Sequence, residues 1–331
     1  MAKVSVLMAV RNAAAFLPAS LDSLISQTFS DWEALCVDDA STDDSLSVLQ
    51  AYAARDSRIL VRSKTVSGGA FLARQEGLEL ATGAYVTMLD ADDWLAPDAL
   101  ELAVALLDGN ADSDVVLYDL RMVFADHEEQ FPLLSSCLRG EEAFCRSLTW
   151  DIHGVSMMRR ELCAVSLKPL EESPKALQLL NSDEQATQLR YLYSRGVRQC
   201  GGIYYYRQHE ESSTRRVSVR RFDVLRGEEL MNRFLATKGM SREIRDAYES
   251  HRWLTLVDLY MFYHCHGRQL SAEERRKGLG ELRQTWCSVR RDALKKETTA
   301  KFGYRPCRWW WLFRMQEWLY FTLRGLFGRN H

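Results

Sequence analysis

Three carboxylates follow directly on a short apolar run. Residues 84–89 read Ala-Tyr-Val-Thr-Met-Leu, and Asp90, Asp92 and Asp93 come next. Apolar, β-branched and aromatic residues in such a run predict a buried strand, whose C-terminal edge is where open α/β sheets bind ligands. Because hard oxygen ligands suit Mg²⁺ or Mn²⁺, these carboxylates are candidates for a metal site that bridges to phosphates. The alternative is an acidic turn in which Asp93 or Asp98 caps the next helix.

The elements that must position these side chains alternate between strand and helix. Strands are predicted at 4–10, 32–37, 58–62 and 84–89, with helices at 14–26, 43–53 and 69–81 between them. Ser41 or Thr42 is expected to cap the second of these helices. This βαβα order predicts an α/β fold with a parallel, doubly wound sheet. Later elements are predicted as a helix after Pro97, a strand at 114–123, a helix at 141–148, a strand at 155–158, a helix at 183–194, a strand at 199–207 and mainly helices from 218 onward.

Composition limits the class of protein. The chain has 331 residues, 47% of them hydrophobic, which is enough for a large core or two domains. Its eight cysteines include no CxxC pair, which indicates reduced thiols in a cytoplasmic protein and not a disulfide framework or zinc site. The first residues enter a strand directly, so no signal peptide is expected. No uncharged run reaches 18 residues, so no membrane-spanning helix is expected.

Charge is distributed unevenly along the chain. Residues 215–331 carry 25 Lys and Arg against 13 Asp and Glu, a net charge of +12, whereas the remainder carries −14. This predicts a basic module attached to an acidic one, and a basic module can contact nucleic acid, an anionic membrane or an anionic acceptor. Its aromatic residues cluster and are not spaced as stacking platforms, so nucleic acid is not the expected partner.

Three further groups are predicted to lie at the sheet edge that carries the acidic residues. Residues 9–12 read Ala-Val-Arg-Asn, residues 37–43 read Val-Asp-Asp-Ala-Ser-Thr-Asp, and Gly68-Gly69 opens the helix that leads through 73–77, Ala-Arg-Gln-Glu-Gly. Together with 81–93, these groups resemble the nucleotide-sugar-binding half of the family 2 glycosyltransferases. The family pattern runs from a strand ending in YN, through DDGSTD, to ARNxGxxxAxGxYxxxLDxDD. The resemblance covers about residues 3–110 and implies a GT-A fold.

The resemblance also implies roles for single residues. Ala9, Arg11 and Asp39 fall where the family holds the nucleotide base, and a carboxylate at this position can accept the imide N–H of uracil. Arg74 would bind the diphosphate or Asp90, Asp90 would meet the ribose, and Asp92 would ligate Mn²⁺ or Mg²⁺. The nucleotide-sugar-binding residues implied in this way are Ala9, Arg11, Asn12, Asp39, Arg74, Asp90, Ala91 and Arg207.

Two later segments complete the resemblance. Residues 181–190, Asn-Ser-Asp-Glu-Gln-Ala-Thr-Gln-Leu-Arg, are similar to the family segment that supplies the catalytic base. Counting back from Arg190 puts Glu184 at the base position, whereas branches that read N-x-D-E put it at Asp183, which we favour slightly. Residues 203–214 resemble a YRxHxxSxT segment, in which Arg207 would clamp phosphate and His209 would bind the metal or the diphosphate.

Some positions depart from the family pattern. Arg11 stands where the family has Tyr, so a guanidinium face can replace ring stacking on the base. Gln75 replaces Asn, and Ala40 replaces the Gly of DDGS, which argues against a positive φ at this position. The QxxRW motif of processive synthases is absent after residue 200, which favours transfer of a single sugar.

The C-terminal stretch 308–329 contains four Trp, three Phe and four Arg. Such a composition suits an amphipathic helix that lies on an anionic membrane, with arginines snorkelling to the interface. The alternative is a helix docked on the rest of the protein or on a second copy of the chain in a homodimer. The membrane interpretation predicts a peripheral protein at the inner face of the plasma membrane.

These features predict an inverting, non-processive glycosyltransferase. It would move one hexosyl or N-acetylhexosaminyl group from a UDP-sugar, or another nucleoside diphosphate sugar, to a glycan or lipid-linked acceptor in cell-surface polysaccharide synthesis. Residues 1–110 would bind the donor, 111–217 the acceptor, and 218–331 would form the basic helical region with its tail from about 304. The alternatives are a non-catalytic glycan-binding scaffold of the same fold and a sugar nucleotidyltransferase. The latter should carry a Gly-rich basic loop after the first strand, which is missing.

Overall fold

A computed structural model describes residues 2–171, 179, 181–208, 217–294 and 309–326 of the chain. These residues fall into two compact units. The first comprises Met1–Gln178 and Ala186–Ser212, and the second comprises Leu179–Gln185 and Ser213–His331. The predicted boundary at residue 110 falls inside the first unit, so the assignment of 1–110 and 111–217 to donor and acceptor stays a prediction.

The first unit is built on a mixed sheet with the path β3-β2-β1-β4-β9-β6-β10-β5. Parallel pairing joins β1 to β2 and β4, β2 to β3, and β6 to β10. The strands are β1 (Val4–Val10), β2 (Trp32–Asp38), β3 (Ile59–Ser63), β4 (Tyr85–Met88), β5 (Trp94–Leu95), β6 (Val115–Val123), β7 (Glu128–Gln130), β8 (Leu138–Arg139), β9 (Ser156–Arg159) and β10 (Gly196–Arg207). The predicted α/β fold with a mostly parallel sheet is confirmed.

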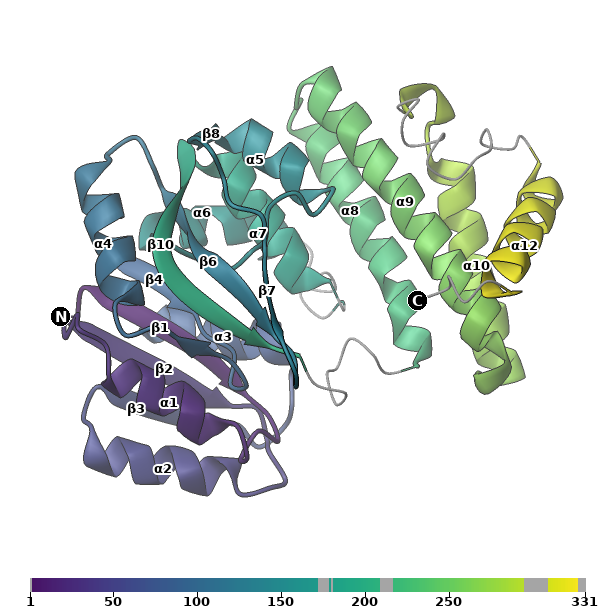
Figure 1. Cartoon of the computed structure of the whole chain (residues 1–331). Helices are drawn as coiled ribbons and strands as arrows, with labels where there is room; N and C mark the ends of the chain where they lie inside the picture. Colours follow the sequence, from purple (N-terminus) through teal and green to yellow (C-terminus); the bar gives the residue numbers. More distant parts are fainter. Residues whose placement is uncertain (1, 172–178, 180, 209–216, 295–308, 327–331) are drawn as a thin grey trace. The chain divides into compact units, whose positions relative to one another are not determined.

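Helices cover both faces of this sheet. In the view of Figure 1, α1 and α2 lie in front of β1, β2 and β3, and α3 lies behind them. Alternate residues of β1 explain this arrangement, because Val4, Val6 and Met8 join the core under α1 and α2, whereas Leu7 faces α3 at Gly77. The helices of this unit are α1 (Leu17–Ile25), α2 (Ser45–Arg55), α3 (Ala70–Leu80), α4 (Ala99–Gly109), α5 (Gly140–Ser147) and α6 (Arg160–Glu171), with most of α7 (Ser182–Tyr193).

Antiparallel strands extend the sheet beyond the parallel core. β9 pairs antiparallel with β4 and β6, and the two-residue strand β5 pairs antiparallel with β10. The sequence pattern located β9 but not its direction, and it missed β5, β7, β8 and α6. The pairing of β5 with β10 matters for the site, because it brings residues 94–95 beside Tyr204 and Tyr205.

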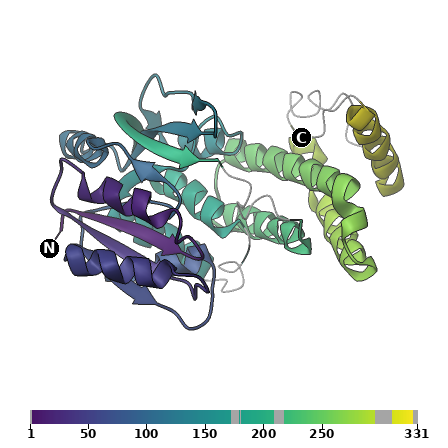
Figure 2. The ribbon, with the colours of Figure 1, turned by 60° about the horizontal axis from the view of Figure 1, so that its bottom comes forward.

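The second unit is helical, as predicted for the C-terminal region. It contains η3 (Val219–Asp223), α8 (Val224–Thr237), α9 (Arg242–His266), η4 (Gly267–Gln269), α10 (Ala272–Ser288), η5 (Arg291–Ala293) and α12 (Trp310–Leu326), and the first turn of α7 belongs with it. Helices α8, α10 and α12 pack on α9, and Figure 2 gives a second view of them in green to yellow. Among the described residues, no helix is long and apolar enough to cross a membrane.

Candidate functional site

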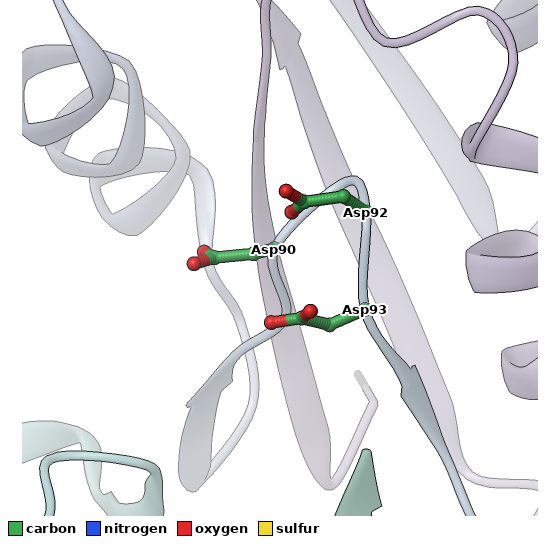
Figure 3. A group of neighbouring side chains, drawn as sticks. All are labelled: Asp90, Asp92 and Asp93. Carbon is green, nitrogen blue, oxygen red and sulfur yellow. The ribbon is translucent and has the colours of Figure 1, made fainter. Parts of the chain in front are cut away.

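The acidic turn lies between β4 and β5. Asp90, Asp92 and Asp93 each offer a carboxylate oxygen within 4.8 Å of the others. Their side chains project to the same side of the turn (Figure 3), and Ala91 between them is buried. Strand β4 ends at Met88, so the chain turns where a parallel strand opens onto its C-terminal edge. The predicted gathering of carboxylates at this edge is present.

Asp93 is the buried member of the turn. Its Oδ2 accepts the Tyr204 hydroxyl at 2.8 Å and its Oδ1 accepts the backbone N–H of Arg207 at 2.8 Å. Burial, together with the charges of Asp90 and Asp92, raises the pKa of Asp93 to about 8. The prediction that Asp93 or Asp98 caps the following helix is wrong. Asp98 precedes α4 without a side-chain capping bond, and Asp93 bonds to β10.

Asp90 is paired with a cation from α3. Arg74 Nη2 lies 2.5 Å from Asp90 Oδ1, and the Asp90 side chain is 42% exposed. The sequence offered the diphosphate or Asp90 as the partner of Arg74, and the structure shows the pair with Asp90. The guanidinium of Arg74 therefore neutralises part of the negative charge of the acidic turn.

Asp39 is buried at the end of β2 and binds the loop that precedes α3. Lys64 Nζ, Ser67 Oγ and the N–H groups of Gly68 and Gly69 all lie 2.6–2.8 Å from its two oxygens. Burial would raise the pKa of Asp39, but these bonds lower it well below its ordinary range. The four donors fill the four lone-pair positions of the carboxylate. A nucleotide base that reaches Asp39 must therefore replace one of them.

Asn12 joins the loops that follow β1 and β2. Asn12 Oδ1 accepts the N–H of Thr42 at 2.8 Å, and the Asn12 N–H donates to Ser41 Oγ at 3.1 Å. Asn12 has φ 52° and Ala40 has φ 57°, both in the left-handed region. The inference that Ala40 argues against a positive φ is therefore wrong, because Ala occupies the conformation that Gly adopts without strain.

Ser41 and Thr42 do not cap helix α2. The residue before α2 is Asp44, which makes no side-chain capping bond. The hydroxyl of Ser41 is the acceptor of the Asn12 N–H, so this side chain serves the contact between loops. The expected cap is therefore wrong, because a tertiary partner competes for the short polar side chain.

Arg207 lies among aromatic side chains at the end of β10. Its guanidinium lies 4.6 Å from the ring centroid of Trp94 and 5.5 Å from that of Phe16. Trp94 stacks on Tyr205 with centroids 5.2 Å apart, and Arg207 Nε donates to the carbonyl oxygen of Asp92 at 2.9 Å. Arg207 thus fixes the backbone of the acidic turn and brings a positive charge to it.

The remaining predicted residues are placed as follows. Arg11 is exposed beside Asp39, with Nη1 4.0 Å from Oδ2, and it bonds Ser67 Oγ. Ala9 is half-buried in β1. Asp183 and Glu184 occupy the first turn of α7 in the second unit, where burial raises the pKa of Glu184. His209 lies outside the described residues.

Pattern reasoning missed three residues of the site. Lys64 and Ser67 bind Asp39, and Tyr204 binds Asp93. Tyr204 belongs to a run of three tyrosines. Because successive residues of a strand point to opposite faces, this run could have indicated that one tyrosine hydroxyl, here that of Tyr204 and not of the half-buried Tyr205, is buried. Lys64 and Ser67 carry no local signal, because their role depends on the parallel pairing of β2 with β3.

The acidic turn fits a divalent cation. Its donors are hard carboxylate oxygens that lie within 4.8 Å of one another, so negative charges in this turn repel one another. A cation would relieve this repulsion, and the half-buried Asp92 is one of the three residues that offer it an oxygen atom.

A known protein family and several known proteins are similar to this chain. Residues 5–165 match the model of Glycosyl transferase family 2. A poly(ribitol-phosphate) beta-glucosyltransferase of Bacillus spizizenii is 38% identical over 101 residues, which is 30% of this chain and 16% of that protein. A PGL/p-HBAD biosynthesis glycosyltransferase of Mycobacterium bovis is 35% identical over 119 residues, 36% of this chain and 46% of that protein. The chain thus spans less than half the length of these curated relatives.

Two solved structures share the fold. Residues 1–349 of TarS from S. aureus, in complex with UDP, superpose with a TM-score of 0.65 and 19% identity over 99% of this chain and 92% of that one. The mannosyltransferase PcManGT from Pyrobaculum calidifontis, in complex with GDP-Man and Mn²⁺, gives a TM-score of 0.53 and 18% identity over 99% and 88%. These likenesses confirm the predicted GT-A-type fold.

Proposed function

Because residues 5–165 of this chain belong to glycosyl transferase family 2, we propose that the protein is an inverting glycosyltransferase. It transfers one sugar from a nucleoside diphosphate sugar, in the first place a UDP-sugar, to a hydroxyl group of an acceptor. The observation that carries the proposal is the acidic turn, whose three carboxylates converge beside Arg74. A non-catalytic scaffold of the same fold would not need this concentration of charge.

The donor is proposed to bind along the C-terminal edge of β1, β2 and β4. Ala9, Arg11 and Asp39 hold the base, and Asn12 fixes the loop beside it. Arg11 is exposed and can stack on the base, while the imide N–H of uracil exchanges with one of the four donors on Asp39. UDP bound to TarS supports this class of donor, and GDP-Man bound to PcManGT names the other nucleotide to test.

The metal is proposed to be Mn²⁺ or Mg²⁺, with Asp92 as its ligand beside Asp90 and Asp93. By family resemblance His209 is a further candidate ligand. When bound, the cation supplies Lewis-acid neutralisation of the charge that develops on the leaving diphosphate. Arg74 and Arg207 add fixed positive charge at the same turn, which stabilises the same developing anion.

The chemical step needs one base and no covalent intermediate. A carboxylate of α7, Asp183 or Glu184, removes the proton of the acceptor hydroxyl. The acceptor oxygen forms a bond to the anomeric carbon as the bond to the diphosphate oxygen breaks, so the anomeric configuration inverts. General-base assistance of this kind typically contributes about 10²–10⁴-fold in rate. Asp183→Asn and Glu184→Gln, compared side by side, identify the base, and equal mild losses would exclude both.

The acceptor is proposed to be a glycan or a lipid-linked intermediate of cell-surface polysaccharide synthesis, such as lipopolysaccharide, capsule or exopolysaccharide. The two curated relatives, named for poly(ribitol-phosphate) and for PGL/p-HBAD biosynthesis, support a cell-envelope acceptor. The basic second unit suits an anionic acceptor as well as an anionic surface.

Helix α12 is proposed to bind the inner surface of the plasma membrane. One face packs Phe313, Glu317 and Phe321 into the second unit, where Phe313 contacts Trp253 and Tyr260. The other face exposes large apolar side chains, among them Trp311 at 63%, Trp318 at 55% and Leu319 at 53%. Exposed Trp and Leu on one helix face, with arginines on the same helix, suit the lipid interface. A second copy of the chain is the other occupant that a binding test must distinguish.

The experiment that tests the function is a donor screen. The full chain is incubated with Mn²⁺ and UDP-, GDP-, dTDP- and CDP-sugars, and release of the nucleoside diphosphate is measured. Release from one donor, stimulated by a glycolipid acceptor, supports the proposal. Tight donor binding without turnover on any acceptor supports the non-catalytic scaffold. Formation of a sugar nucleotide from a sugar phosphate and a nucleoside triphosphate supports the sugar nucleotidyltransferase.

A further inference from the structure

The first turn of α7 is seated against α8 by a buried polar contact. Asn181 Nδ2 donates to Glu228 Oε1 at 3.1 Å, and Glu228 is 1% exposed. A Cβ added at Gly227 would lie 2.5 Å from Asn181 Oδ1 and 2.7 Å from Gln185 Nε2, so the backbone of α8 approaches α7 closely. The turn that carries the two candidate bases is therefore held by α8 within the same unit.

A histidine on α9 faces this contact. His251 Nε2 lies 3.4 Å from Glu228 Oε2, and both side chains are buried. Tyr248, one turn earlier on α9, also interacts with Glu228. Burial would raise the pKa of Glu228, but His251, Tyr248 and the charge of Arg252 bring it below its ordinary value. Glu228 is therefore held as an anion against a histidine that can carry a positive charge.

Arg252, a buried cation close to Glu228 and His251, forms its ion pairs with two other carboxylates. Arg252 Nη1 lies 2.9 Å from Glu249 Oε2, and its Nη2 lies 2.5 Å from Glu229 Oε2. Arg252 is fully buried, and Glu249 is 1% exposed. The groups that act electrostatically on Glu184 are His251 and Glu228, whose charges have opposite signs.

Glu184 responds to this environment. Burial raises the pKa of Glu184, the charge of His251 opposes the rise, and Glu228 adds to it. A carboxylate can accept a proton from a hydroxyl only in its ionised form. A positive charge on His251 therefore favours the ionised form of this carboxyl.

We propose that Glu228 and His251 are positioning residues of the transfer reaction. Glu228 seats the first turn of α7 through Asn181, and His251, paired with Glu228, brings a positive charge to the turn that carries Glu184. The inference rests on the proposed function, and of the two candidate bases it concerns Glu184. Glu228 acts through His251, whose Nε2 lies 3.4 Å from its Oε2, and through Asn181, which it binds directly. Neither residue exchanges a proton with the acceptor.

The test follows the ionisation of Glu184 directly, so that it does not depend on catalysis. The full chain is labelled with ¹³C at the glutamate carboxyl, and the Glu184 signal is identified by its loss in Glu184→Gln. In His251→Gln the titration midpoint of Glu184 should rise by at least about half a pH unit. In Glu228→Gln the ring of His251 should titrate at lower pH than in the wild type, because an opposing charge is lost.

The matched control is Glu249→Gln. Glu249 is as buried as Glu228 and lies on the same helix as His251, but its ion pairs are with Arg252 and Arg290. This variant should leave the Glu184 midpoint within about 0.2 units of the wild type. A Glu184 midpoint that is unchanged in His251→Gln overturns the inference. If that variant does not fold, the wild-type carboxyl signal of Glu184 must show a second inflection at the midpoint of His251, and its absence overturns the inference as well.

The pH profile of kcat/KM supplies the functional arm. With Glu184 as the base, the acid limb in His251→Gln moves upward together with the NMR midpoint. If the NMR midpoint of Glu184 moves while the acid limb of the kcat/KM profile does not, Glu184 is not the base. If no donor is turned over by the wild type, the proposed function fails, while the carboxyl titration still shows whether His251 controls Glu184.

Discussion

The Tyr204 hydroxyl donates a 2.8 Å hydrogen bond to Oδ2 of Asp93, and this bond ties β10 to the acidic turn after β4. The same hydroxyl accepts the backbone N–H of Asp90 at 3.1 Å. One buried side chain therefore fixes both ends of the turn. The geometry of the proposed metal site thus depends on a strand that lies more than a hundred residues later in the chain.

Tyr204→Phe should loosen this turn. The substitution removes the hydroxyl that donates to the carboxyl of Asp93, which is 1% exposed. Loss of such a bond to a buried group lowers the free energy of unfolding by about 1–3 kcal/mol. Urea unfolding measures the effect. Tyr205→Phe, at the neighbouring half-buried ring that stacks on Trp94, is the control and should cost less than about 0.5 kcal/mol. Equal losses in the two variants would show that the bond to Asp93 has no special weight.

Ala40→Gly should stabilise the protein. Ala40 has φ 57°, and an L-residue with a Cβ pays about 1–2 kcal/mol in the left-handed region, whereas Gly does not. Part of this gain is offset by the greater freedom of Gly in the unfolded chain, which leaves an expected gain of about 0.5–1 kcal/mol. Ala51→Gly, at an exposed position in the interior of α2, should lose about 1 kcal/mol in the same urea experiment. A loss in both variants would contradict the strain assigned to Ala40.

Stability should fall as the pH rises through the range in which Glu317 ionises. Glu317 is fully buried, neither carboxyl oxygen has a hydrogen-bond partner among the described residues, and burial raises its pKa to about 8. The folded state then binds a proton that the unfolded chain has released above about pH 4.5. The contribution of Glu317 is full below that pH and is lost as the pH rises toward 8, at up to about 1.4 kcal/mol per unit.

Glu317→Gln removes this titration and should flatten the pH dependence of unfolding between pH 5 and 8. Urea midpoints at pH 5.5, 6.5 and 7.5 provide the measurement. Glu273→Gln, at an exposed position of α10, keeps the wild-type slope. Parallel pH curves for the wild type and Glu317→Gln would contradict the burial of an unpaired carboxyl in α12.

The exposed face of α12 should govern membrane binding. A triple variant in which Trp311, Trp318 and Leu319 are all changed to Ser should reduce co-sedimentation with anionic liposomes at least about tenfold. The reason is that the variant loses apolar surface that enters the lipid interface. Trp150→Ser, at a Trp that is 66% exposed in the first unit, is the control and should bind as the wild type does. Unchanged liposome binding, or a loss of dimer in solution with liposome binding intact, would contradict the membrane proposal.

The sequence predicted the parts of the site that depend on local pattern. Asp90 and Asp92 follow a strand, and Arg74 follows a Gly-rich helix start, so their approach could be expected from βαβ order alone. It did not predict that Asp93 would be buried against Tyr204, because that contact depends on the pairing of the two-residue strand β5 with β10. The prediction that Ala40 would not adopt a positive φ was wrong, because the Cβ of alanine makes this conformation less favourable but does not forbid it.

The proposed metal site is tested by comparing nucleoside diphosphate release by the wild type and by Asp92→Asn, with and without Mn²⁺. Release should depend on the metal and should fall at least about 100-fold in Asp92→Asn, while the exposed Asp98→Asn keeps the wild-type rate. Release by Asp92→Asn at the wild-type rate would contradict the proposed metal site.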